Sequence, residues 1–178
     1  MKKFFILIVT FLVTACQTQP VNKPLTKEVE CSVSFKNQHC SFISEETSII
    51  VELKTKEIND AEKLLTGLQV LLNNQEHLLS VSEDITLFEH DIGYILLTDI
   101  NFDGFPDLAL STSFGVANQY FDYWTYQPAH EKYEFIGNLP KLGLDKENNH
   151  LHSVIKINAN EYKETSYSWH DGQLVPSN

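Results

Sequence analysis

The pattern of apolar and polar positions predicts a chain built mainly of β-strands. Short runs rich in branched and aromatic residues recur along it, and clusters of Asn, Asp, Gly and Pro separate them. The expected strands lie at residues 49–53, 68–72, 77–79, 92–97, 108–110, 119–127, 133–136, 151–157, 161–169 and 173–175. Their close spacing predicts antiparallel pairing, and Asp171-Gly172 is a strong hairpin signal. The expected fold class is mainly β, and sandwich-like and propeller-like sheets both fit.

One segment carries a mixed signal. Asn59 is a residue type that caps helices, and the apolar residues after it, including Ala61, Leu64 and Leu65, recur at helical spacing. The alternative to an all-β chain is therefore one short helix over residues 59–65.

The first residues have the zones of a bacterial lipoprotein signal peptide. Lys2 and Lys3 are followed by an apolar run of about ten residues, which is too short for a transmembrane helix. Val13-Thr14-Ala15-Cys16 then matches a lipobox, in which two small residues precede the cysteine that receives the lipid. We expect lipidation of Cys16, which anchors the chain stably when several acyl chains are added. The alternative is an ordinary cleavable signal peptide in which Cys16 is incidental.

This N-terminus defines the expected domains. Residues 1–15 are the signal peptide, residues 16–27 are the lipidated cysteine with a flexible polar tether, and residues 28–178 form a single β-rich domain. Gln17 stands where an inner-membrane retention signal would place Asp. The expected location is therefore the periplasmic face of the outer membrane, with the inner membrane as the less favoured alternative.

The charge of the chain limits its partners. It has 13 basic residues, all of them lysine, against 24 acidic residues, which gives a net charge of −11. Such a chain is a poor partner for nucleic acid or for an anionic lipid surface. A basic protein or a metal ion is the better partner, and membrane contact is expected through the lipid anchor.

Two further cysteines are expected to form a disulfide. Cys31 and Cys40 lie nine residues apart in a chain expected outside the cytoplasm. Alternating apolar residues on either side of residues 36–39 predict two strands of one hairpin, bridged by the disulfide. The rival is a metal site made of both cysteines and His39, which lacks a fourth ligand.

Residues 99–108, DINFDGFPDL, are the most specific motif of the chain. Side-chain oxygens alternate, and Gly104 permits a sharp turn with positive φ that returns the next carbonyl toward the same centre. Hard oxygen ligands in a tight loop are what Ca²⁺ prefers. The expected calcium ligands are Asp99, Asn101, Asp103, the main-chain carbonyl of Phe105, and Asp107. The ion would be structural, and a metal-free Asx turn is the alternative.

The sequence offers no catalytic constellation, so we expect no enzymatic activity. Ser111 and Ser113 do not lie in a nucleophile elbow, and no Ser/His/Asp arrangement follows from the spacing. His150 and His152 share one face of an expected strand, but no third ligand for zinc accompanies them.

From Asp99 to the C-terminus the sequence resembles a family of small calcium-binding bacterial lipoproteins with FG-GAP-like loops. The segments that carry this resemblance are DINFDGFPDL, STSFGVANQY, FDYWTYQPAHEKYEF and YKETSYSWHDGQLV. The best-described members are periplasmic immunity proteins that inhibit peptidoglycan-cleaving effectors. The resemblance implies a propeller-like fold, the calcium ligands named above, and a role as an inhibitor of a secreted peptidoglycan hydrolase, comparable to a lysozyme inhibitor.

The loop after the calcium motif is where partner contacts are expected. The candidate contact residues are Ser113, Phe114, Asn118 and Tyr120. The alternative function is a non-inhibitory scaffold or structural lipoprotein of the envelope, in which calcium only stabilises the fold.

Overall fold

The computed structural model describes residues 27–44 and 47–177, which form three antiparallel sheets with no helix among them. The central sheet has the order β1-β6-β7-β8-β9, the N-terminal sheet β2-β3-β4-β5, and the C-terminal sheet β10-β11-β12-β13. The strands are β1 (Val29–Ser34), β2 (His39–Ile43), β3 (Ser48–Asn59), β4 (Glu62–Leu72), β5 (Gln75–Phe88), β6 (Ile92–Thr98), β7 (Asp107–Ser111), β8 (Tyr120–Gln127), β9 (Lys132–Pro140), β10 (Leu142–Asp145), β11 (His150–Lys156), β12 (Tyr162–His170) and β13 (Gln173–Ser177).

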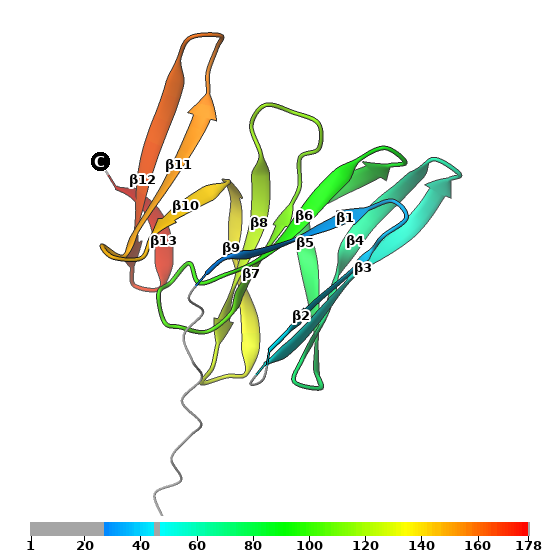
Figure 1. The fold of residues 1–178 in the computed structure, drawn as a ribbon, viewed down its shortest axis with the longest axis horizontal. Coiled ribbons are helices and arrows are strands. Elements are labelled where there is room, and N and C mark those ends of the chain that lie inside the picture. The colour runs from blue at the N-terminus through cyan, green and yellow to red at the C-terminus, as the bar shows by residue number, and fades with distance from the viewer. Residues whose placement is uncertain (1–26, 45–46, 178) are drawn as a thin grey trace, which may run out of the picture.

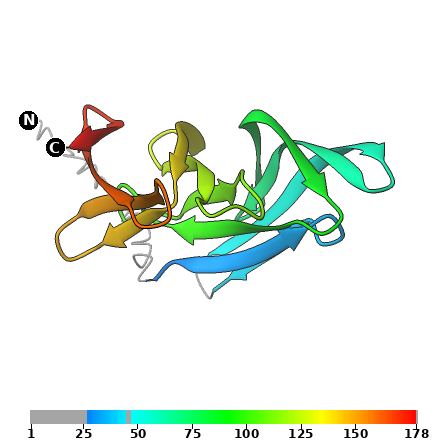
Figure 2. The same ribbon diagram turned by 90° about the horizontal axis from the view of Figure 1, so that it is seen from above.

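The central sheet is buried on both faces, with one outer sheet against each face (Figures 1 and 2). Successive residues of a strand point to opposite faces, so Leu96 of β6 enters one core while Ile95 and Leu97 enter the other. This explains why β6 and β7 are almost continuously apolar. The prediction of a mainly β, antiparallel, sandwich-like fold is confirmed, and the propeller-like alternative is not.

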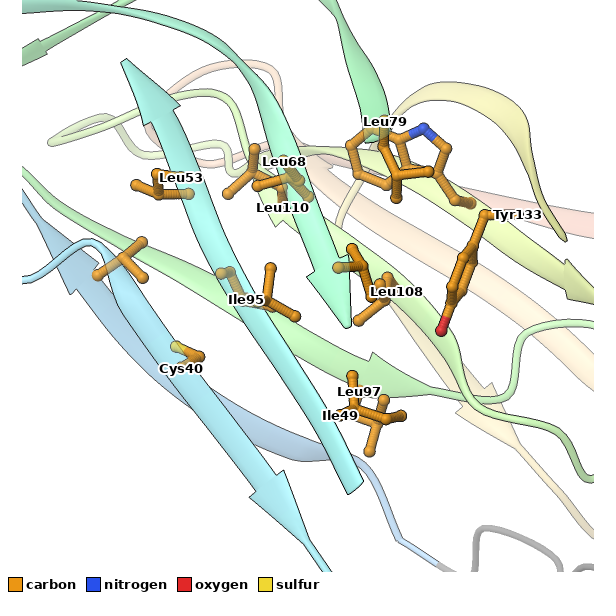
Figure 3. Packing of buried hydrophobic residues seen from close by; sticks show 14 of the residues in the cluster. Cys40, Ile49, Leu53, Leu68, Leu79, Ile95, Leu97, Leu108, Leu110 and Tyr133 are labelled. Atoms are coloured by element: carbon orange, nitrogen blue, oxygen red, sulfur yellow. The ribbon is translucent and has the colours of Figure 1, made fainter. Parts of the chain in front are cut away.

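The first core lies between the central and N-terminal sheets. Figure 3 shows its packing, in which side chains from β3 and β4 face side chains from β6 and β7. Ile49 and Leu68 meet Leu108 and Ile95 there, and each of the four is at most 1% exposed. Burying one such side chain fully contributes about 1.5–3 kcal/mol.

The second core lies between the central and C-terminal sheets. Phe121 and Tyr123 of β8 pack with Leu151 of β11 and Tyr167 of β12. Ile100, which precedes β7 and lies outside any strand, is a fully buried member of this core. The predicted calcium loop is thus part of the packing between two sheets.

The disulfide between Cys31 and Cys40 is confirmed, but the predicted hairpin around it is wrong. β1 pairs with β6 of the central sheet, whereas β2 pairs with β3 of the N-terminal sheet. Alternation of apolar residues fixes which face of a strand is buried but not which strand lies beside it. The bridge therefore ties two sheets together across the edge of the first core.

The alternative of a helix over residues 59–65 is also wrong. β3 ends at Asn59 and β4 begins at Glu62, so a tight hairpin turn joins the two strands. The Asn59 side chain does form a local cap, because its Oδ1 accepts a hydrogen bond from the Ala61 backbone N–H at 2.9 Å. It closes a turn instead of a helix because β3 and β4 continue into long paired strands.

Candidate calcium loop and binding surface

The predicted calcium loop connects β6 to β7 and lies against the C-terminal sheet (Figure 1). Ile100 and Phe102 of the loop pack into the second core, whereas Phe105 packs against the first. Trp169 of β12 donates its indole Nε1–H to the Ile100 carbonyl at 2.8 Å. The loop therefore contacts both cores at the point where the chain passes from β6 to β7.

Side-chain oxygens of the loop accept hydrogen bonds from its own backbone. Asp99 Oδ2 accepts from the Gly104 N–H at 3.2 Å, and Asp103 Oδ1 accepts from the Phe105 N–H at 2.8 Å. Asn101 Oδ1 accepts from the Asp103 N–H at 3.2 Å. Gly104 has a φ of 84°, which confirms the positive φ expected there. These bonds hold the three side chains against the backbone of the loop.

Asp107 has a different position from the other predicted ligands. It is fully buried, and its two carboxylate oxygens accept backbone hydrogen bonds from Ile100 at 2.9 Å and from Tyr126 at 2.8 Å. Burial raises the pKa of Asp107 well above its usual value, and the two hydrogen bonds offset this only in part. The side chain links the loop to β8.

Asp99 supplies the observation that fits a bound cation. Its side chain is 6% exposed, and Oδ1 is buried without a hydrogen-bond partner among the described residues. Burial, followed by the nearby charge of Asp103, raises the pKa of Asp99. An unpartnered buried carboxylate oxygen costs free energy that a divalent cation would remove.

The acidic side chains do not form a complete site by themselves. In residues 27–44 and 47–177, no three His, Cys, Asp or Glu side chains gather closely enough to hold a metal ion. The predicted ligands Asp99, Asp103 and Asp107 are among these residues, so the structure does not bring their three carboxylates together around one centre. The five ligands remain a prediction.

The loop between β7 and β8, residues 112–119, is fastened at its base. Ser113 Oγ accepts a hydrogen bond from the Tyr120 N–H at 2.8 Å and donates one to the Asn118 carbonyl at 3.3 Å. The Asn118 amide binds both backbone groups of Lys156 on β11, at 3.0 Å to the carbonyl and 2.7 Å from the N–H. A protruding loop is thereby fixed to two sheets.

Three of the four predicted contact residues lie in this loop and the fourth, Tyr120, is the first residue of β8; all four are only partly exposed. Ser113 and Asn118 use their polar groups inside the protein, and Phe114 packs against the first core. The exposed tip is Val116, which is 57% exposed and which the sequence did not single out. The sequence feature that indicates this tip is an apolar residue beside Gly115 in a polar loop.

An open groove of about 440 Å³ separates this loop from the C-terminal sheet. Val116 and Asn118 line one wall, and His152 and Val154 line the other. Three exposed apolar side chains lie on or next to β11 and β12. They are Val154 on β11 (54% exposed), which lines the groove, Ile157 after the end of β11 (53%), and Tyr162, the first residue of β12 (62%). We call the β7–β8 loop, the groove and these side chains the groove surface.

The predicted signal peptide and the lipidation site Cys16 lie outside the described residues. Across the part of the chain that is described, no helix is long and apolar enough to cross a membrane.

Comparisons with known proteins gave no relative. No protein-family model matches the chain, and neither the curated proteins nor the solved structures contain a significant match.

Proposed function

We propose that this protein is a lipid-anchored protein of the cell envelope that binds and inhibits a peptidoglycan-cleaving enzyme. In this proposal, calcium in the loop of residues 99–107 stabilises the fold. The observation that carries it is the groove surface, where a braced loop presents Val116 beside further exposed apolar residues.

A braced loop favours tight binding because less conformational freedom is lost when a partner docks. Ordering an interface loop costs free energy, and a loop already held by hydrogen bonds has met most of that cost. Tyrosine is among the side chains that contribute most to protein interfaces, and exposed apolar groups gain free energy when a partner removes them from water. Val116, Val154 and Tyr162 therefore form a suitable contact surface.

The charge of the chain supports a basic partner. Its net charge of −11 would attract a cationic enzyme over distances of about a Debye length and increase the association rate. A lipid anchor on Cys16 would hold the inhibitor where cell-wall enzymes act.

The calcium part of the proposal rests on the loop chemistry. The residues that would hold the ion are Asp99, Asn101, Asp103, the Phe105 carbonyl, and Asp107. A bound divalent ion would supply positive charge beside the buried carboxylate of Asp99. The unpartnered oxygen of Asp99 supports this assignment.

The test measures inhibition by the full-length protein, purified in detergent, of peptidoglycan hydrolysis. The enzymes are a basic lysozyme and any secreted hydrolase encoded beside the gene. Val116→Asp is expected to weaken inhibition of the target about tenfold or more, because it places a charge in the contact surface. Leu78→Asp is the matched control, since Leu78 is 72% exposed on the N-terminal sheet, and it should inhibit like the wild type.

Inhibition of none of these enzymes would reject the proposal. Binding of an envelope protein without any effect on hydrolysis would instead favour the scaffold alternative.

A further inference from the structure

The loop of residues 99–107 makes a hydrogen bond to the C-terminal sheet. Trp169 Nε1–H donates to the Ile100 carbonyl at 2.8 Å, and Trp169 also packs against the second core. Ile100 lies between two predicted ligands, Asp99 and Asn101. The direction of its carbonyl is therefore coupled to the directions of the neighbouring side chains.

We infer that Trp169 is a positioning residue that couples calcium binding in this loop to the order of the C-terminal sheet and the groove surface. The inference rests on the calcium site proposed above. It assigns to Trp169 a role outside the ligand set, acting through the Ile100 carbonyl.

The coupling has a physical basis in how the loop is packed. The Asp99 and Asp103 carboxylates accept hydrogen bonds from Gly104 and Phe105 of the same turn, and without a cation their like charges repel one another. Ile100 is fully buried beside them, so opening of the loop disturbs the second core directly. An ion that holds the loop closed also holds the Ile100 carbonyl where Trp169 reaches it.

Backbone pairing and hydrogen bonds connect the strand of Trp169 to the groove surface. Trp169 itself pairs with Leu174 of β13, but the preceding part of β12, from Tyr162 to Tyr167, pairs with β11. Lys156 at the end of β11 is bound on both backbone groups by Asn118 of the β7–β8 loop. β11 also supplies His152 and Val154 to the groove. Loosening of the C-terminal sheet therefore changes the wall of the groove and the fastening of its loop.

By linkage, a contact that calcium strengthens must in turn strengthen calcium binding. Trp169→Phe keeps an aromatic ring in the core but removes the donor to Ile100. Loss of one such hydrogen bond is expected to raise the calcium dissociation constant about two- to tenfold. Calorimetric titration of calcium into the full-length protein, stripped with a chelator, measures this change.

Tyr167→Phe is the matched control, because Tyr167 lies on the same strand and in the same core. Its hydroxyl pairs with Ser153 Oγ of β11 at 3.2 Å. This variant should bind calcium within about twofold of the wild type. Equal dissociation constants for wild type, Trp169→Phe and Tyr167→Phe would overturn the coupling while leaving the calcium site intact.

A second measurement uses the wild type alone and decides the matter if Trp169→Phe fails to fold. The two indole N–H resonances report Trp169 in the second core and Trp124 in the first. Calcium should shift the Trp169 signal more than that of Trp124, and should slow hydrogen exchange across β11 and β12. If calcium binds and exchange slows only in residues 99–107, the coupling is rejected. If the wild type binds no calcium, the calcium site proposed above fails and the coupling fails with it, whereas the inhibition test still stands by itself.

Discussion

The two interfaces of the central sheet are built differently. Among the described residues, the first core contains 20 buried residues and the second contains eight. The first is also crossed by the Cys31–Cys40 disulfide and by Asp122, which binds Ser82 of β5 with both carboxylate oxygens at 2.7 Å. The second depends on the loop of residues 99–107 and on Trp169. The C-terminal sheet is thus attached by the smaller core.

The central sheet is therefore tied covalently to the N-terminal sheet on one face and joined through a loop to the C-terminal sheet on the other. The predictions below test it by disturbing one face at a time.

The largest effect is expected from removing a core side chain of β6. Leu96 and Leu97 are neighbours that point into the second and the first core, respectively. Leu→Ala at either position should cost about 2–5 kcal/mol of unfolding free energy, measured by urea titration. Hydrogen exchange distinguishes the two variants. Leu96→Ala should speed exchange in the C-terminal sheet, and Leu97→Ala should speed exchange in the N-terminal sheet. Identical exchange patterns would show that the two faces unfold as one unit.

Opening the disulfide should have the next largest effect. Reduction, or Cys31→Ser with Cys40→Ser, removes a constraint on the unfolded chain worth about 2–3 kcal/mol for a loop of this length. The melting temperature should fall, with protection lost mainly between β1 and β2. If calcium still raises the melting temperature after reduction, the disulfide and the calcium loop stabilise the fold independently.

Removing calcium is expected to act on the other face. At free calcium ten times its dissociation constant, binding stabilises the fold by about 1.4 kcal/mol. Chelation should therefore lower the melting temperature, and Asp103→Ala should abolish that response. The same transition with and without calcium in the wild type would reject the metal site.

The fold was predictable where local pattern decides it. The runs at residues 92–97 and 151–157 became β6 and β11 because a buried strand needs little beyond branched and aromatic residues. β10 was missed because Gly143 interrupts a strand of only four residues. The hairpin expected at Cys31 and Cys40 failed because pairing partners are chosen by long-range packing.

The candidate site was predictable in its motif but not in its surface. The spacing of residues 99–107 identifies a tight turn whose side-chain oxygens accept hydrogen bonds from its own backbone, since this geometry is local. In contrast, Ser113 and Asn118 are polar residues of a loop, and this pattern predicts that their side chains are exposed. Their partners lie in other parts of the chain, such as Lys156 for Asn118, and no local pattern indicates them.

The smallest effect concerns His77, which lies on the first face between β5 and the central sheet. Its ring contacts the rings of Tyr126 and Tyr133 edge-on, and its Nε2 is buried without a hydrogen-bond partner in the described chain. Burial lowers the pKa of His77 below its usual 6.5, so the folded state favours the neutral ring.

The sign of the pH effect follows from this shift. Above pH 6.5 the ring is neutral in both states, and His77 contributes no pH dependence. As the pH falls below 6.5, the unfolded chain takes up the proton first, so stability is lost. His77→Phe should therefore reduce the fall in melting temperature as the pH is lowered below about 6.5, measured by thermal unfolding at a series of pH values. Because His77 touches only the first face, exchange in the C-terminal sheet should not follow this titration; if it does, the two faces are not separate.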